Sequence, residues 1–227
     1  MTTTQRLRRI VTAAVVATLI AGVLLVAPAA VAPLRLPTAS AACPAIEVIF
    51  ARGRLEPPGA GQIGNAFVSG LRQKTGKNVN LYAVRYPADN QIDVGANDMS
   101  ARVQSTMASC PDTRIVLGGY SLGAAVTDVA LAVPFAFFGF DNPLPPDAEQ
   151  HIAAVALFGN GSQWVGPITN FNPVYNERTI ELCHGDDPIC NPTEPDNWQA
   201  YWPDHLAPAY IKAGMVSQAV DFVAGRV

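Results

Sequence analysis

Apolar residues along this chain follow two spacings in turn, one typical of buried strands and the other of amphipathic helices. Short runs that are apolar throughout, or that alternate with polar residues, indicate strands. The strands that this pattern predicts are Ile46–Ala51, Asn78–Tyr86, Arg114–Gly119, Ile152–Phe158 and Arg178–Leu182. Between them apolar residues recur four apart, as Ile63, Phe67 and Leu71 do, which places them on one face of a helix. The predicted helices are Gln62–Lys74, Val94–Ser109, Ser121–Val133 and one or two over His205–Arg226.

This alternation of strands and helices predicts the class of fold. Strands that are separated by helices usually lie parallel in one sheet, which the helices then cover on both faces. We therefore expect an α/β fold of three layers, α/β/α, around a central and mostly parallel sheet of about five strands.

The first 41 residues are predicted to be a secretory signal peptide. Three arginines in the first nine residues precede the apolar segment Ile10–Ala27, and small residues ending in Ala39-Ser40-Ala41 follow. This is the order of a cleaved signal peptide. A membrane anchor is the alternative, since an 18-residue apolar segment is at the lower limit of spanning length. We favour cleavage, because small residues and prolines follow rather than clustered charges, and we expect residues 42–227 to be one secreted domain.

Charge excludes one class of partner. The predicted signal contains four of the fifteen basic residues and no acidic residue, so the remainder has 11 basic and 18 acidic residues and a formal net charge of −7. Nucleic-acid binding is not expected, because contact with phosphates requires a basic face.

The four cysteines predict two disulfides, because their number is even and the chain is expected to be exported. Of the three possible pairings we favour Cys43–Cys110 with Cys183–Cys190, the second of which closes a short loop. A zinc site is the weaker alternative, since the spacings contain no C-x₂-C pair. We expect no metal and no cofactor.

Ser121 is the candidate nucleophile. It lies in Gly119-x-Ser121-x-Gly123, between a predicted buried strand and a predicted helix. This context is typical of the nucleophile elbow, a turn so tight that the residues two before and two after the serine must be small. The helix start also offers unpaired N–H groups to a developing oxyanion. The alternative is a serine that only caps the helix.

A nucleophilic serine needs a base, and His205 is the best of the three histidines. His151 precedes a core strand, and His184 lies in the short loop between two cysteines. The orienting acid is expected between Ser121 and His205 along the chain, after a late strand. Asp186 and Asp187 both satisfy this, although Asp-Asp-Pro could also be a plain turn.

Together these motifs resemble the cutinase family of secreted α/β-hydrolase serine esterases, from about residue 43 to the C-terminus. The resemblance rests on Phe50-Ala51-Arg52-Gly53 with Glu56, Gly119-Tyr120-Ser121-Leu122-Gly123, Cys183-x₃-Asp187-x₂-Cys190 and His205-Leu206. It implies that Ser121 is the nucleophile, His205 the general base and Asp187, rather than Asp186, the orienting acid. It also implies the disulfide pairing favoured above.

Two positions depart from the family pattern. Leu122 follows the nucleophile where cutinases usually have glutamine, and Arg54 stands where several members have a small hydroxyl residue. The resemblance implies an oxyanion hole made by the backbone N–H groups of Leu122 and Arg54, without a side-chain hydroxyl. Loss of one oxyanion donor costs about 3–4 kcal/mol in other enzymes, so this departure bears on rate or substrate choice.

Aromatic residues suggest an apolar mouth. The predicted substrate-binding residues are Tyr120, Trp198, Tyr201, Trp202 and Leu206, of which Trp198–Trp202 lie in a Pro-rich loop before His205. A second group, Phe135, Phe137, Phe138 and Phe140, follows the helix after Ser121. For these phenylalanines we favour packing at the edge of the core over a flap that contacts acyl chains or a lipid surface.

Three functions are compatible with this reading. The favoured one is a secreted carboxylesterase or lipase that hydrolyses aliphatic or lipid esters, as a monomer in transient contact with a lipid or polymer surface. A carbohydrate acetyl-ester hydrolase on the same fold is the second, and a shallow polar cleft would support it. A catalytically weak surface-binding protein is the third, and the departures at Arg54 and Leu122 keep it open.

Overall fold

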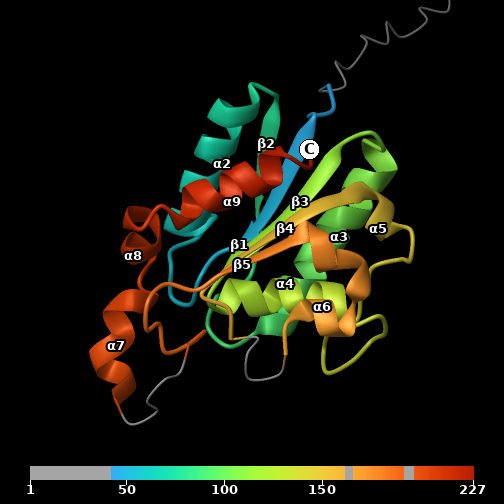
Figure 1. Cartoon of the computed structure of the whole chain (residues 1–227). Coiled ribbons are helices and arrows are strands. Elements are labelled where there is room, and N and C mark those ends of the chain that lie inside the picture. Colours follow the sequence, from blue (N-terminus) through green and yellow to red (C-terminus); the bar gives the residue numbers. More distant parts are fainter. Residues whose placement is uncertain (1–41, 162–165, 192–196) are drawn as a thin grey trace, which may run out of the picture. The chain divides into compact units, whose positions relative to one another are not determined.

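One sheet of parallel strands forms the centre of the molecule (Figure 1). The computed structural model describes residues 42–161, 166–191 and 197–227, so the predicted signal peptide lies outside the described residues. The strands, in the spatial order β2-β1-β3-β4-β5, are β2 (Val79–Ala83), β1 (Ile46–Ala51), β3 (Arg114–Tyr120), β4 (Ile152–Phe158) and β5 (Thr179–Leu182). Every neighbouring pair is parallel, which confirms the predicted class of fold. Residues 42–227 form one compact unit.

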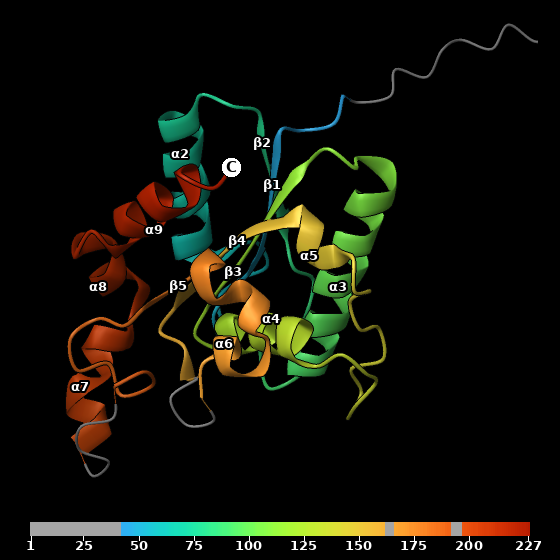
Figure 2. The same ribbon diagram turned by 45° about the vertical axis from the view of Figure 1, so that its right-hand side comes forward.

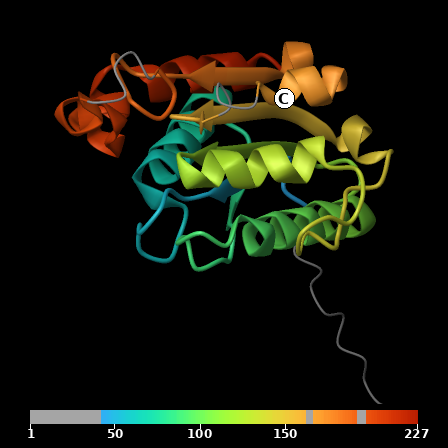
Figure 3. The ribbon, with the colours of Figure 1, turned by 90° about the horizontal axis from the view of Figure 1, so that it is seen from below.

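Helices cover both faces of the sheet, which gives three layers (Figure 2). The longer helices are α2 (Gly61–Thr75), α3 (Ile92–Ser109), α4 (Leu122–Ala132) and α9 (Met215–Ala224). The shorter ones are α5 (Ala148–His151), α6 (Ile168–Phe171), the 3₁₀ helix η2 (Pro173–Arg178), α7 (Trp198–His205) and α8 (Ala207–Lys212). Helices α2 and α9 pack together on one face, whereas α3 and α4 lie side by side on the other (Figure 3).

Two hydrophobic cores result, because successive side chains of a strand point to opposite faces. In β1, Val48 and Phe50 contribute to the core under α2 and α9, while Ile49 and Ala51 contribute to the core under α3 and α4. All four are fully buried. This burial on both faces explains why β1 is an uninterrupted apolar run apart from Glu47.

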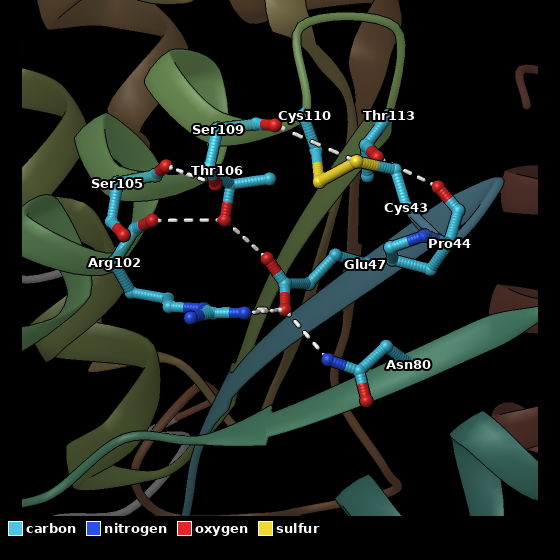
Figure 4. The surroundings of a disulfide bond; sticks show 10 residues. All are labelled: Cys43, Pro44, Glu47, Asn80, Arg102, Ser105, Thr106, Ser109, Cys110 and Thr113. Carbon is cyan, nitrogen blue, oxygen red and sulfur yellow. Dashed lines mark hydrogen bonds and ion pairs between the residues drawn. A yellow bond between two sulfur atoms is a disulfide. The ribbon is translucent and has the colours of Figure 1, made fainter. Parts of the chain in front are cut away.

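Glu47 is accommodated by a polar network at the other end of the sheet from Ser121 (Figure 4). Its carboxylate accepts hydrogen bonds from Arg102, from Thr106 Oγ1 and from Asn80 Nδ2, the last at 2.8 Å. A buried carboxylate requires such partners, since burial without them costs several kcal/mol. Beside this network the Cys43–Cys110 disulfide joins the start of β1 to the end of α3.

The short helices α5, α6 and η2 were not predicted, and the structure differs from the predicted pattern in three further places. His205 does not begin the last helix but ends α7, and Trp198–His205, expected as a Pro-rich loop, is helical although Pro203 lies within it. The proline is tolerated because α7 is short and ends two residues later, where Leu206 returns to extended backbone. The strand predicted over Asn78–Tyr86 ends at Ala83.

The third difference concerns the phenylalanines after α4. Core-edge packing is correct for Phe140, which is buried, but wrong for Phe135, Phe137 and Phe138, which are 60%, 54% and 87% exposed. The pattern misled because aromatic residues at this density usually belong to a core, whereas here they surround a tight turn.

Candidate active site

Ser121 lies on a strained turn between β3 and α4. Its backbone has φ 53° and ψ −120°, a conformation that L-residues seldom adopt. The flanking glycines are required by space, because a Cβ on Gly119 would lie 2.1 Å from the carbonyl oxygen of Gly123, and one on Gly123 would lie 2.0 Å from that of Ala51. The Ser121 side chain makes no capping hydrogen bond to α4, so helix capping does not explain the serine.

The hydroxyl of Ser121 begins a chain of three polar side chains. Its Oγ lies 2.8 Å from Nε2 of His205, and Nδ1 of His205 lies 2.7 Å from Oδ2 of Asp187. His205 is 3% exposed and Asp187 is fully buried. The three residues come from the ends of β3 and α7 and from the loop after β5, so the fold brings together residues that are up to 84 positions apart.

The loop that carries Asp187 is closed by the Cys183–Cys190 disulfide. Within it, the N–H of Asp187 donates to the carbonyl of His184, and the N–H of Ile189 donates to Oδ1 of Asp187 at 2.8 Å. Its neighbour Asp186 is exposed, and its N–H donates to Oδ2 of Asp204 at 3.0 Å, whereas the carboxylate that contacts His205 is that of Asp187. Of the two candidate acids, the structure therefore brings only Asp187 to the imidazole.

The other two histidines lie apart from Ser121. His184 contacts Asp204, with 3.5 Å between Nδ1 and Oδ1. His151 ends α5, immediately before β4 begins, and thus lies at the end of the strands opposite to Ser121.

Tyr210, in α8, was not predicted from the sequence as a site residue. Its hydroxyl donates to Oδ2 of Asp187, the same oxygen that His205 contacts, and the side chain is fully buried. The sequence contains one weak signal for this role. A tyrosine in a core position needs a hydrogen-bond partner for its hydroxyl, but the sequence does not show which residue that partner is. Burial and the neighbouring Asp187 carboxylate raise the pKa of Tyr210, so the phenol keeps its proton and remains a donor.

The ionisation of Asp187 follows from these contacts. Burial by itself raises the pKa of a carboxyl group. Here the hydrogen bonds from His205 and Tyr210, the charge of His205 and the N–H of Ile189 outweigh burial and hold the pKa of Asp187 below its ordinary value. Asp187 is therefore an anion under neutral conditions.

Tyr120 and Trp202 contact the imidazole of His205. The rings of Tyr120 and His205 are stacked with centroids 5.4 Å apart, and the Tyr120 hydroxyl donates to the backbone carbonyl of His205. The Trp202 ring lies 4.8 Å from that of His205 and is packed edge-on by Trp198. These aromatic contacts restrict the rotation of His205.

The loop after β1 faces Ser121 and presents an unbonded N–H group. The N–H of Gly53 donates to Oε2 of Glu56 at 2.7 Å, that of Glu56 donates to the Gly53 carbonyl, and that of Leu55 donates to the carbonyl of Ala88. Among the residues that the structure describes, no acceptor is found for the N–H of Arg54. The loop thus leaves one donor available beside the cavity that Arg54 lines.

A cavity of about 740 Å³ opens over Ser121 and His205. Its lining is largely apolar, with Leu55, Leu122, Ala125, Ile189, Trp202, Leu206, Ala207 and Pro208. Of the predicted substrate-binding residues, Tyr120, Trp202 and Leu206 line it. Trp198 and Tyr201 are absent from its described lining.

The described part of the chain contains no group of three or more His, Cys, Asp or Glu residues arranged to hold a metal ion. Nor does any helix in this part have the length and apolar character needed to cross a membrane.

Comparisons with known proteins bear on this site. The Cutinase family model matches residues 42–227. The "Probable carboxylesterase Culp2" of Mycobacterium tuberculosis is 66% identical over 223 residues, which cover 97% of each chain. This chain belongs to the cutinase family. The "Phospholipase Culp4" of the same species is 46% identical over 223 residues, 96% of this chain and 92% of that one.

Solved structures of cutinase-like enzymes have the same fold. A Trichoderma reesei cutinase in complex with a phosphonate inhibitor has a TM-score of 0.62 and 28% identity, over 81% of this chain and 76% of that chain. The catalytic core domain of an acetyl xylan esterase from the same fungus has a TM-score of 0.63 at 23% identity, over 82% of this chain and 100% of that chain, and shows the shared fold alone. As a member of the cutinase family with carboxylesterase relatives, the chain is a carboxylic ester hydrolase.

A half-buried carboxyl group, Asp128, lies on α4, the helix that follows Ser121. Asp128 accepts a hydrogen bond from Nδ2 of Asn160 at 2.9 Å, and Asn160 adjoins Gly161 of the cavity lining. Burial raises the pKa of Asp128 to about 7, although the hydrogen bond from Asn160 acts in the opposite direction. The side chain therefore binds its proton more tightly in the folded than in the unfolded chain.

This raised pKa predicts a pH dependence of stability. Asp128 contributes to the free energy of unfolding through this tighter proton binding. The contribution is fully present below about pH 4, the pKa of the group in the unfolded chain, and is lost as the pH rises through 7. Between pH 5 and pH 8 we expect the free energy of unfolding of the wild type to fall by about 2–3 kcal/mol relative to that of Asp128→Asn. Urea unfolding at both pH values measures this difference. The exposed Asp112→Asn is the control and should follow the wild type. Parallel curves for Asp128→Asn and the wild type would contradict the assignment.

Tyr210→Phe tests the contact to Asp187. We expect kcat for a soluble ester to fall about 10- to 100-fold with little change in KM, since hydrogen bonds to charged groups contribute about 1.5–3 kcal/mol. Tyr175→Phe alters a buried tyrosine of the other core and serves as the matched control for a general effect on stability. If Tyr210→Phe had an unchanged kcat, Tyr210 would have no role in positioning Asp187.

Proposed function

We propose that this chain is a secreted serine esterase that hydrolyses aliphatic or lipid esters through Ser121, His205 and Asp187. The observation that carries the proposal is the continuous contact from Ser121 Oγ through His205 to Asp187, at 2.8 Å and 2.7 Å, beneath an apolar cavity. A serine, a histidine and a buried acid in this geometry recur on unrelated folds as an acyl-transfer site.

In the first half-reaction, the Oγ of Ser121 attacks the ester carbonyl carbon and transfers its proton to Nε2 of His205. Asp187 accepts the Nδ1–H of His205, fixes the tautomer that leaves Nε2 free to act as a base, and stabilises the imidazolium. His205 then returns the proton to the leaving alkoxide oxygen. The alcohol departs and the acyl group remains on Ser121.

In the second half-reaction, water takes the place of the alcohol. His205 removes a proton from the water, the hydroxide attacks the acyl carbon, and the carboxylic acid leaves as Ser121 Oγ regains the proton. Each step develops negative charge on the carbonyl oxygen, so donors aimed at that oxygen lower both barriers.

The backbone N–H groups of Leu122 and Arg54 are proposed to bind that oxygen. Leu122 begins α4 directly after Ser121, where the N–H groups of a helix have no partner within the helix. The N–H of Arg54 lies beside those of Gly53, Leu55 and Glu56, which all have acceptors within the fold. Both residues line the cavity. A backbone N–H does not depend on the side chain, so leucine and arginine at these two positions are compatible with the role.

The lining of the cavity supports the proposed class of substrate. A site for a sugar acetate would need polar groups that bind hydroxyls, and a shallow polar cleft was the feature expected for that alternative. The cavity is instead lined mainly by aliphatic and aromatic side chains. An acyl chain longer than acetyl fits this lining, and the names of Culp2 and Culp4 as carboxylesterase and phospholipase are consistent with it.

Export is part of the proposal. The predicted signal peptide and the two disulfides, Cys43–Cys110 and Cys183–Cys190, both point to an oxidising compartment.

Hydrolysis of p-nitrophenyl esters of increasing acyl length tests the proposal. We expect kcat/KM to be higher for butyrate or longer esters than for acetate, because the additional methylenes bury apolar surface in the cavity. Ser121→Ala should lose at least about a thousandfold in kcat while its melting temperature stays close to that of the wild type. A serine-directed phosphonate should label the wild type alone.

Either of two results would contradict the proposal. Comparable activity in Ser121→Ala would remove Ser121 as the nucleophile, and a marked preference for acetate would favour the carbohydrate acetyl-ester alternative.

A further inference from the structure

Three exposed phenylalanines surround one tight turn between α4 and α5. We name Phe135–Phe140 the phenylalanine hairpin. Phe137 and Phe140 exchange two backbone hydrogen bonds of 2.9 Å each, so Phe138 and Gly139 form a two-residue turn. Both turn residues have positive φ, 44° for Phe138 and 84° for Gly139. Turns of this kind usually have asparagine or aspartate at the first position, because a bulky side chain there is sterically unfavourable.

The hairpin is held firmly on α3. Nδ2 of Asn97 donates to the Gly139 carbonyl at 2.7 Å, and Oδ1 of Asn97 accepts the N–H groups of Asp141 and Asn142 at 2.9 and 3.0 Å. Phe140 anchors the base because its side chain is buried in the core. The fold thus fixes a strained turn that presents Phe138 at its tip.

The exposed rings contact one another rather than the core. The Phe135 and Phe137 centroids are 6.1 Å apart and those of Phe137 and Phe138 are 4.3 Å apart, both edge-to-face. Three neighbouring phenylalanines that are more than half exposed stabilise the folded chain little, since their apolar surface stays in water. A contact outside this chain would explain their position.

The hairpin and the helix beside the cavity project from the same side of the molecule. Figures 1 and 2 show the loop after α4 extending below α3, and α7 extending to the same lower side at the other end of the molecule. Helix α7 bears the exposed Trp198 and Trp202, of which Trp202 lines the cavity. The surface of one extended partner below the molecule could therefore contact the hairpin and α7 at the same time.

We propose that the phenylalanine hairpin inserts into the surface of an uncharged lipid assembly and holds the cavity over its substrate. The inference rests on the proposed function, in which the substrate is a lipid ester. Phe135, Phe137 and Phe138 enter the acyl-chain boundary, and the rigid turn keeps the rings exposed before contact, so little conformational freedom is lost on binding.

Charge favours an uncharged lipid over an anionic one. Asp93 lies beside Gly139, where a Cβ would come within 2.7 Å of its carboxylate, and Asp141 follows the hairpin directly. Residues 42–227 also have a formal net charge of −7. Anionic head groups would be repelled, because interfacial segments for such lipids are rich in lysine and arginine.

The shape of the hairpin favours a lipid assembly over a second copy of the chain as its partner. A protein interface needs an extended and complementary surface of about 800 Å² on each partner. The hairpin instead presents a narrow tip of adjacent phenylalanines, which suits insertion between lipid molecules.

Vesicle partitioning tests the proposal, with every variant built on Ser121→Ala so that no lipid is hydrolysed. The combined variant Phe135→Ser, Phe137→Ser and Phe138→Ser should bind phosphatidylcholine vesicles at least about tenfold more weakly than the parent in sedimentation assays. Ile211→Ser, which changes an apolar side chain of α8 that is 38% exposed, is the control and should bind like the parent. Adding phosphatidylglycerol to the vesicles should not strengthen binding by the parent.

Three results would overturn the proposal. These are unchanged binding by the combined variant, an equal loss in Ile211→Ser, and a change of oligomeric state on sedimentation velocity, which would identify a second copy as the partner. With Ser121 intact, the combined variant should hydrolyse soluble p-nitrophenyl butyrate at the wild-type rate. If the wild type hydrolyses no soluble ester, the proposed function fails, whereas the vesicle result still decides the role of the hairpin.

Discussion

The buried carboxylate of Asp187 is the group on which the rest of the site depends. A charge without solvent contact is stable only when hydrogen bonds surround it. The fold supplies these from three separate segments: the N–H of Ile189 in its own loop, the imidazole of His205 at the end of α7, and the phenol of Tyr210 in α8. Satisfying this one carboxylate therefore fixes the position of the C-terminal helices relative to the sheet.

The strained turn at Ser121 is the matching constraint from the other side. The parallel sheet directs the end of β3 toward this loop, and Gly119 and Gly123 allow the backbone to reverse against Ala51. The unfavourable φ of 53° is tolerated because the strand and helix on either side are buried. Ser121 Oγ is consequently held at 2.8 Å from the imidazole without a capping bond to its own helix.

The sequence allowed the fold class, the strand order along the chain and the residues around Ser121 to be predicted, because each depends on local spacing. Glycines two residues before and after a serine, or apolar residues four apart, report directly on backbone geometry. Contacts between distant segments left weaker signals. The spacing of Tyr210 is that of an ordinary core aromatic residue, and its contact with Asp187 leaves no local pattern. Pro203 argued against a helix where α7 forms. The exposure of Phe138 depends on a turn that is bonded to Asn97 of another helix.

Comparison of Asp187→Asn with Asp186→Asn tests the central claim most directly, since the two residues are adjacent and the substitutions are chemically identical. Asp187→Asn should lower kcat on p-nitrophenyl butyrate by about four orders of magnitude, the loss seen in serine proteases when the histidine tautomer is no longer fixed. Asp186→Asn should stay within a few-fold of the wild type, because Asp186 is exposed and the imidazole of His205 is bonded to Asp187 instead. Equal losses in the two variants, or full activity in Asp187→Asn, would contradict the account.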